Sequence, residues 1–447
     1  MKLVFVHGWS VNSTTTYGEL PEVLKRESPV ELNIEIENIY IGEYISFHDE
    51  VLLDDISRAF EQARKDKLGN EDFACITHST GGPVIRLWVE LFYAKERLNE
   101  CPLTHLIMLA PANHGSPLAL LGKERVGRIK AWANGVEPGE GVLNWLELGS
   151  QGQWDLNSSW MNNSAIGNAF HSFVLSGETI DRKLYDFIND YLVEKGSDGV
   201  VRLCGANLNY KSVKLVQDCT LDGNPLKLVG DIYNSRKCAF EVINSASHTG
   251  DKIGIMESVK KSRKVKPVIY SIIKALEVNN QDDYNETSEI MRHQTLHTQS
   301  KHDRYMMFVF SLKDNYNNSI HDYDMLLLAG DDYEPDILPK GFFVDKQKND
   351  SSGNLVYYLN YDKFKKLKNE KLGIRIVARP DKGFSYYEIA EFHLNNFELK
   401  ELIKANETVM VEVVLERRIA ENTFVLDSGS NSEKKFKTRE PSINKLA

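Results

Sequence analysis

Three residue types, serine, aspartate and histidine, occur in the sequence in a fixed order. Together they can form a nucleophile. Ser79 lies in the segment T-H-S-T-G, residues 77–81, between a short apolar run and a stretch with helical apolar spacing. A serine hydroxyl becomes nucleophilic when a histidine accepts its proton, and that histidine needs a carboxylate to fix its tautomer. A serine flanked by small residues at a strand-to-helix turn is a nucleophile elbow, for which the acid and then the base follow later in the chain. The search for both partners therefore runs forward from Ser79.

The predicted base is His248, in the segment S-A-S-H-T-G after the last apolar run of the first 264 residues. The other histidines between Ser79 and this point are His105, His114 and His171, which lie in or just after predicted strands. A lone loop histidine commonly has no catalytic task. A loop that follows a late strand is nevertheless where such a site requires its base, so His248 is our prediction.

The predicted acid is Asp198, in the segment G-S-D-G-V-V. An Asp-Gly pair is also a common turn, which is the structural alternative. Glu178 and Asp181 follow the apolar run 171–176 and could occupy the usual position of the acid at the end of a strand. Asp198 is preferred, and the other two carboxylates stay open.

The negative charge that develops during acyl transfer needs two backbone N–H groups, each worth about 3 kcal/mol in transition-state stabilisation. One is expected from Thr80, directly after the nucleophile. The other is expected from the loop after the first strand, with Trp9 preferred and Ser10 next, while His7 is left outside the catalytic set. Residues 113–116, N-H-G-S, are predicted at the same sheet edge, where a substrate-pocket role and a simple turn are both open.

The elements that must position these residues alternate over the first 264 residues between short apolar runs and helical patterns, which is typical of a parallel sheet covered by helices. Strands are predicted at 2–7, 32–36, 73–77, 104–110, 170–176, 200–203 and 238–243. Residues 117–163 interrupt this rhythm and carry four of the six tryptophans. We interpret this segment as a packed cap over the site, with an ordinary helical insertion as the alternative.

The pattern changes after residue 264. Residues 265–301 are predicted to be a helical and polar linker. Between 302 and 427, short runs with period-two alternation recur and predict a β-sandwich. Residues 428–447, rich in Gly, Ser, Asn and Lys, are predicted to be a disordered tail.

Composition excludes several function classes. A formal net charge of −10 with no basic stripe argues against nucleic acid as a partner. The five cysteines are scattered without metal-ligand spacing, and we predict neither a metal nor a cofactor. Residues 1–8 resemble a strand more than a signal peptide, and no window reaches the ~18 apolar residues of a membrane span. We therefore expect cytoplasmic synthesis, with any export independent of a cleaved leader.

Together the segments H-G-W, T-H-S-T-G-G, A-P-A-N-H-G-S, S-D-G-V-V and S-H-T-G resemble the lipase-type branch of the α/β-hydrolase superfamily, which includes bacterial lipases and GPI-inositol deacylase-like proteins. The resemblance covers about residues 1–260. It implies an α/β-hydrolase domain with a cap, and hydrolysis of lipid carboxylic esters through an acyl-serine intermediate. The elbow departs from G-x-S-x-G by having Thr77, and the spacing from Asp198 to His248 leaves room for an inserted hairpin around residues 222–224.

The predicted substrate is thus a lipid or another acyl ester, as for a lipase or phospholipase. The β-rich part is expected to help hold a membrane surface or a large substrate. The alternatives are an esterase or thioesterase on small acyl substrates and a non-catalytic binding protein with a hydrolase fold. A leaderless lipase-like domain with an appended module is similar in plan to antibacterial phospholipase effectors delivered by type VI secretion, for which a delivery or immunity partner is expected. The same plan fits a plain cytosolic esterase.

Overall fold

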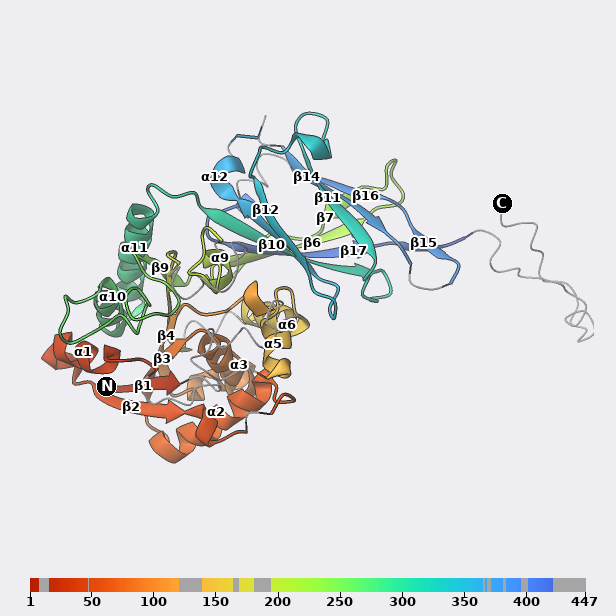
Figure 1. The fold of residues 1–447 in the computed structure, drawn as a ribbon. Coiled ribbons are helices and arrows are strands. Elements are labelled where there is room, and N and C mark those ends of the chain that lie inside the picture. The colour runs from red at the N-terminus through yellow and green to blue at the C-terminus, as the bar shows by residue number, and fades with distance from the viewer. Residues whose placement is uncertain are drawn as a thin grey trace, which may run out of the picture.

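The first half of the chain builds a six-stranded parallel sheet (Figure 1). The computed structural model describes residues 1–7, 16–46, 48–119, 139–163, 169–180, 194–364, 366–367, 371–380, 383–394 and 401–420. The strand order is β2-β1-β3-β4-β5-β9. The strands are β1 (Lys2–His7), β2 (Glu35–Tyr40), β3 (Phe73–His78), β4 (Leu103–Leu109), β5 (His171–Gly177) and β9 (Ala239–Ile243).

Helices cover both faces of this sheet. Successive side chains of a strand point to opposite faces, and here both sets are apolar and need to be buried. Residues such as Phe5 and Ile107 pack with α1 (Leu20–Glu27), α10 (Pro267–Leu276) and α11 (Gln281–Thr298). Their sequence neighbours, such as Val4 and Met108, pack on the other face with α2 (Leu53–Leu68) and α3 (Gly81–Tyr93). Two further helices, α5 (Glu140–Leu146) and α6 (Gln151–Asn162), lie within the range predicted as a cap, of which residues 120–138 are outside the described part.

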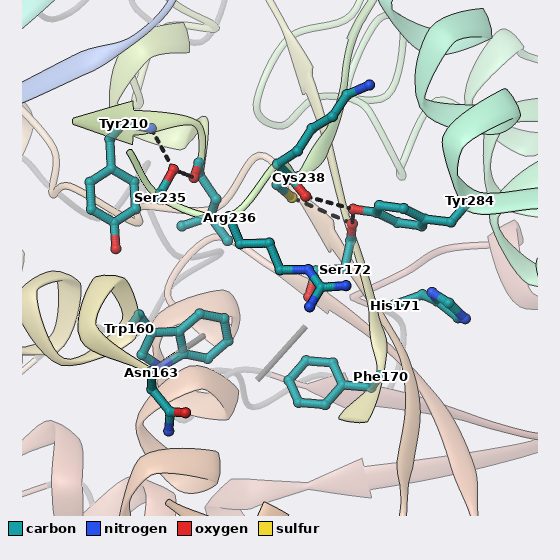
Figure 2. A pocket seen from close by; sticks show the side chains of 12 residues that line it. Trp160, Asn163, Phe170, His171, Ser172, Tyr210, Ser235, Arg236, Cys238 and Tyr284 are labelled. Carbon is teal, nitrogen blue, oxygen red and sulfur yellow. Dashed lines mark hydrogen bonds between the residues drawn. The ribbon is translucent and has the colours of Figure 1, made fainter. Parts of the chain in front are cut away.

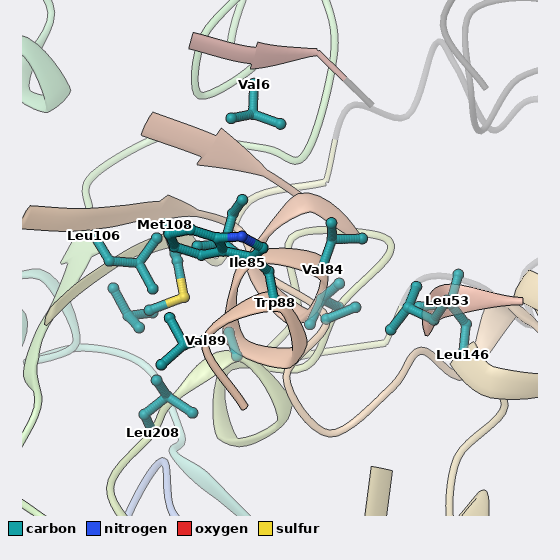
Figure 3. Close-up of a cluster of buried hydrophobic side chains, with 14 of the residues drawn as sticks. Val6, Leu53, Val84, Ile85, Trp88, Val89, Leu106, Met108, Leu146 and Leu208 are labelled. Atoms are coloured by element: carbon teal, nitrogen blue, oxygen red, sulfur yellow. The ribbon is translucent and has the colours of Figure 1, made fainter. Parts of the chain in front are cut away.

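The helix that follows the elbow is anchored by a buried tryptophan. Figure 3 shows Trp88 of α3 among apolar side chains that include Leu106 and Met108 of β4. The indole N–H of Trp88 donates to Glu61 Oε2 at 2.7 Å, which ties α3 to α2. Glu61 also accepts two hydrogen bonds from the guanidinium of Arg64, so the buried carboxylate is paired. This packing fixes the direction in which α3 leaves the sheet.

The second half is a sandwich of two sheets. The larger, seven-stranded sheet has the order β12-β13-β10-β17-β6-β7, with β8 also paired to β6, and the smaller has the order β11-β14-β16. The larger sheet consists of β12 (Phe343–Lys348), β13 (Leu355–Asn360), β10 (Tyr305–Asp314), β17 (Thr408–Leu415), β6 (Tyr210–Gln217), β7 (Leu226–Leu228) and β8 (Tyr233–Asn234). The smaller sheet consists of β11 (Tyr323–Ala329), β14 (Leu372–Ala378) and β16 (Ala390–Leu394). Two short strands, β15 (Ser385–Tyr387) and β18 (Arg417–Ile419), pair with each other. The one-turn helix α12 (Tyr361–Phe364) follows β13.

The larger sheet is buried on both faces. Phe308 and Tyr357 pack toward the smaller sheet, in one apolar cluster with Met325. Met307 and Tyr358, their neighbours in the chain, belong to the same cluster as the helix-covered sheet of the first half. A strand buried on both sides is apolar at almost every position, as in the run Y-M-M-F-V-F of β10. The two halves therefore share a hydrophobic core.

The ranges predicted from the sequence do not follow the sheets. Strands β6, β7 and β8 fall within residues 1–264, yet they pair in the larger second sheet. Helices α10 and α11 fall within residues 265–301, predicted as a linker, and pack on the first sheet through buried residues such as Ile269 and Met291. Residues 421–447, which contain the predicted tail, lie outside the described part.

One predicted strand is wrong. Residues 200–203 form a turn followed by the short helix α9 (Leu203–Ala206). The carboxylate of Asp198 accepts hydrogen bonds from the backbone N–H groups of Val200 and Val201, so these amides are not available to a strand ladder. The apolar residues Val200 and Val201 are buried all the same, which explains why the segment resembled a strand.

Candidate active site

Ser79 lies at a sharp turn between β3 and α3. Its φ of +54° places a non-glycine residue in the left-handed region, which costs about 1–2 kcal/mol. Hydrogen bonds on both sides hold this conformation: the Ser79 N–H donates to Leu109 O at 3.0 Å, and Ser79 O accepts from the N–H groups of Gly82 and Ala112, each at 3.3 Å. The predicted elbow is therefore present, with the backbone fixed around the hydroxyl.

Small residues after Ser79 are required by close contacts. A Cβ atom on Gly81 would lie 3.1 Å from Cβ of Thr77, and one on Gly82 would lie 2.8 Å from Cβ of Pro111. Both distances are shorter than ordinary van der Waals contacts between carbon atoms, which lie near 3.5–4.0 Å. The T-H-S-T-G-G segment is thus set by the approach of α3 to the strand ends.

The structure brings Ser79, His248 and Asp198 into one line of hydrogen bonds. Nε2 of His248 lies 3.1 Å from Oγ of Ser79, and Nδ1 of His248 lies 2.8 Å from Oδ2 of Asp198. A carboxylate can only accept a hydrogen bond, so Nδ1 carries the proton of the neutral ring and Nε2 presents a lone pair to the hydroxyl. This arrangement can remove a proton from Ser79 and stabilise the charge that the imidazole then gains.

Asp198 is held by its own loop. Its Oδ1 accepts from the N–H groups of Val200 and Val201 at 3.0 and 2.8 Å, which leaves Oδ2 for the imidazole. The backbone N–H of His248 donates to Asp198 O at 3.0 Å, so the loop after β9 is also joined to the acid through the main chain. Both side chains are buried, with 0% of Asp198 and 1% of His248 exposed, and water is kept from the pair.

The alternative acids are not brought to this histidine within the described residues. Glu178 accepts hydrogen bonds from Nε2 of Gln299, at 2.9 Å, and from Nδ1 of His302. Asp181 lies outside the described residues, as do Trp9 and Ser10, the candidates for one of the two backbone donors. The other candidate, Thr80, lies at the N-terminus of α3, where backbone N–H groups have no acceptor within the helix.

His78 contacts the predicted base His248, and it was not selected from the sequence. Its ring centroid lies 4.6 Å from that of His248, and its Nε2 donates to the backbone carbonyl of His248 at 3.1 Å. Burial, and next the imidazole of His248, hold the pKa of His78 well below its usual range, so it stays neutral at physiological pH. Its position directly before the nucleophile was the signal available in the sequence.

The segment 113–116 uses its side chains inside the fold. Oδ1 of Asn113 accepts from Nη1 of Arg86 at 3.2 Å, and the Ser116 hydroxyl donates to Val200 O at 2.6 Å. Burial lowers the pKa of His114 to about 3. These contacts favour the interpretation of the segment as a buried turn, and the bond to Val200 makes it a support for the loop of Asp198.

A separate small cavity opens beside α6 and the loop before β9 (Figure 2). Aromatic and basic side chains line it, among them Trp160, Phe170, Tyr284 and Arg236, and Figure 2 shows the guanidinium of Arg236 directed into it. Ser79, Asp198 and His248 are not among its lining residues. We assign this cavity no part in the chemistry at Ser79.

Among the described residues, no three His, Cys, Asp or Glu side chains gather as a metal ion would require. In the same part of the chain, every helix is too short or too polar to cross a bilayer.

The solved structures similar to this chain include two of one bacterial enzyme. Phospholipase PlaB from Legionella pneumophila is 40% identical, with 97% of each chain covered and a TM-score of 0.87. The same enzyme in complex with thio-NAD is 40% identical, with 96% of each chain covered and a TM-score of 0.86. No protein-family model and no curated protein gives a significant match to the sequence. The similarity extends over both halves of the fold, including the two sheets of the sandwich.

Proposed function

The chain belongs to the family of phospholipase PlaB, and from that premise we propose that it is a serine hydrolase that cleaves carboxylic esters of phospholipids. The single observation that supports the chemistry is the pair of hydrogen bonds that joins Oγ of Ser79 through His248 to Asp198, at 3.1 and 2.8 Å. We assign the nucleophile to Ser79, the base to His248 and the acid to Asp198. Thr80 is assigned one of the two N–H groups that stabilise the negative charge.

In the proposed reaction, Nε2 of His248 takes the proton of Ser79 as Oγ attacks the ester carbonyl. The carbonyl electrons move to oxygen, where the backbone N–H of Thr80 donates a hydrogen bond to the negative charge. The tetrahedral intermediate collapses, His248 gives its proton to the leaving alkoxide, and the acyl group stays on Oγ. Water, deprotonated by the same nitrogen, then releases the fatty acid and restores the serine.

The nucleophile, the base and the N–H donors of this reaction are all assigned to groups of the chain, so we keep the expectation that hydrolysis needs no cofactor and no metal. The complex of PlaB with thio-NAD describes a ligand of that enzyme. Contact of this chain with a membrane surface, its location in the cell, and any delivery or immunity partner stay predictions from the sequence.

The proposal is tested by replacing Ser79 with Ala. The assay follows fatty-acid release from phospholipid vesicles and p-nitrophenol release from p-nitrophenyl butyrate, in EDTA and without added dinucleotide. Ser79→Ala should lower both rates by about 10³-fold or more, because the covalent route is lost while binding and charge stabilisation remain. The exposed Ser300 provides the matched control, and Ser300→Ala should keep the wild-type rates and the wild-type reactivity toward a fluorophosphonate probe. Unchanged turnover in the Ser79 variant would exclude the assignment.

Acyl-chain length separates the lipid from the small-ester alternative. A phospholipase should show a kcat/KM that rises from butyrate to long acyl esters, because each buried methylene contributes about 0.8 kcal/mol. A rate that falls with chain length would favour an esterase or thioesterase on small acyl substrates. A wild-type chain that does not react with the fluorophosphonate would favour the non-catalytic binding protein.

A further inference from the structure

Directly after the loop of Asp198 lies an arginine that reaches the second half of the molecule. Arg202 is only 1% exposed, although a guanidinium is always charged. Its Nε and Nη2 donate to the two carboxylate oxygens of Glu194 at 2.8 and 2.7 Å. Nη2 also donates to Oδ2 of Asp345, in β12 of the larger second sheet. The two ends of the segment that carries Asp198, residues 194 and 202, are thus joined to each other by a buried ion pair.

A tyrosine of the same sheet holds the other flank of the loop. The hydroxyl of Tyr358, in β13, donates to Lys195 O at 2.7 Å, and Gly196 O lies 3.3 Å away. Gly196 has a φ of +74°, and a Cβ atom there would lie 2.6 Å from the Tyr358 hydroxyl oxygen. The aromatic ring of Tyr358 also lies under the guanidinium of Arg202, whose central carbon is 4.2 Å from the ring centroid.

These contacts join the loop of Asp198 to the second sheet, in addition to its bonds with His248 and Ser116. His248 follows β9, an edge strand of the first sheet, whereas the loop of Asp198 is anchored to β12 and β13 of the second. The Oδ2–Nδ1 distance of 2.8 Å therefore depends on the second sheet as well as on the direct bond between the two loops. Catalysis is sensitive to such distances, since a displacement of about 1 Å can lower a rate by up to 10²-fold.

We propose that Arg202 and Tyr358 are positioning residues through which the second sheet holds Asp198 against His248. The inference rests on the proposed function, because it assigns these residues a task only if Asp198 is the acid of a working hydrolase. It gives the β-sandwich a role at the reacting centre in addition to any contact with lipid.

The test compares two adjacent tyrosines. Tyr358→Phe removes the hydroxyl bonded to Lys195 and keeps the ring under Arg202. Tyr357→Phe is the matched control, because Tyr357 is the neighbour of Tyr358 in β13 and is also buried. Its side chain points to the other face of the sheet, where its hydroxyl donates to Met325 O of β11 at 2.6 Å. With p-nitrophenyl butyrate, Tyr358→Phe should lower kcat about tenfold with KM unchanged, whereas Tyr357→Phe should keep the wild-type kcat and show a similar shift in melting temperature.

A double variant shows whether Tyr358 acts through the acid. In an Asp198→Ala background, adding Tyr358→Phe should change kcat by less than twofold, because the residue that it positions is gone. An unreduced tenfold loss in that background would overturn the proposal, and so would an equal loss of kcat in the two tyrosine variants. If Ser79→Ala abolishes turnover while Tyr358→Phe leaves kcat unchanged, the proposed function stands and this inference fails.

The ion pair gives a second, independent arm that does not depend on removing the buried cation. Asp345→Asn weakens the anchor of Arg202 while Glu194 still neutralises the guanidinium. Asp362 provides its control, because it pairs with Arg304 at a site with a similar exposure, 25% against 24% for the Asp345 side chain. Asp345→Asn should lower kcat severalfold and Asp362→Asn should not. Equal kcat values in the two variants would contradict the role of Arg202.

Discussion

Ser79 combines an unfavourable backbone conformation with a reactive position. An L-residue with a φ of +54° has its Cβ close to its own carbonyl oxygen, a contact that glycine lacks. Strain of this kind is retained where the surrounding structure fixes it, and here Leu109, Gly82 and Ala112 bond to both sides of the peptide. The elbow therefore lowers stability in exchange for a hydroxyl presented to His248.

The strain can be measured by comparing two inactive variants. Ser79→Gly should be more stable than Ser79→Ala by up to about 1.5 kcal/mol, because relief of about 1–2 kcal/mol of strain exceeds the extra chain entropy of glycine, about 0.5–1 kcal/mol. Urea denaturation of both variants gives the difference. If Ser79→Gly were the less stable of the two, the backbone at this position would not be strained.

The sequence was sufficient to select the three residues that the structure brings together, because Ser79 and His248 follow recognisable strands, Asp198 lies in an Asp-Gly turn between them, and their order is fixed by the fold. Their catalytic roles stay predictions until Ser79→Ala is measured. His78, Arg202 and Tyr358 were not selected. Their contacts join residues that are 170, 143 and 163 positions apart, and among the three only His78, directly before the nucleophile, had a signal in the local sequence.

At the scale of elements, the face of the first sheet under α10 and α11 contains a row of aromatic and imidazole rings, of which His105 and Tyr284 are buried and His171 is half-buried. His105 of β4 lies next to His171 of β5, with 5.5 Å between ring centroids, and His171 stacks on Tyr284 of α11 at 5.3 Å. Nε2 of His105 donates to Val278 O at 2.8 Å. Burial, partly offset by this bond, lowers the pKa of His105 to about 4.

This row predicts a loss of stability in mild acid. The unfolded chain takes up the proton near pH 6.5 and the folded chain only near pH 4, so the contribution of His105 is complete above pH 6.5 and is lost as the pH falls toward 4. At pH 5 the loss is about 2 kcal/mol. In His105→Gln, whose amide can still donate to Val278 O, the drop in urea midpoint between pH 7 and pH 5 should be smaller than in the wild type. Equal drops would show that the imidazole is not buried in its neutral form.

The positions of the strands were predicted better than the sheets to which they belong. The parallel strands of the first sheet were found within a few residues, and the hairpin expected around residues 222–224 is formed by β6 and β7. Its place in the second sheet was not foreseen, because β6 pairs in parallel with β17, nearly two hundred residues later in the chain. Strand β2 begins at Glu35 rather than at residue 32, since a short 3₁₀ turn occupies Val30–Leu32.

At the scale of the whole molecule, the two halves are interleaved along the chain. β6 comes from the first half and lies between β17 and β7 of the second sheet. Met307, Val356 and Tyr358 complete the apolar cluster of the first half from the other side. The α/β-hydrolase fold followed by a β-sandwich is confirmed, and the two parts share one apolar cluster.

We expect a chain truncated after residue 301 not to fold. It would keep β6 without its partner β17 and would expose the apolar residues of the shared cluster, at about 25 cal/mol for each Å² of apolar surface. The truncated chain should be insoluble or should melt without a cooperative transition, as measured by circular dichroism. A sharp transition near that of the full chain would mean that the first half is an independent domain.

The parallel pairing of β6 with β17 also has a consequence for biosynthesis. Gln217, the last residue of β6, leaves the ribosome long before Leu415, the last residue of its partner. At translation rates of roughly 5–20 residues per second, the hairpin of β6 and β7 exists for roughly 10–40 s before β17 is synthesised, and the edge of β6 is unpaired during this time. During that interval the growing polypeptide depends on chaperones, or on transient non-native contacts, to avoid aggregation with its neighbours on the polysome.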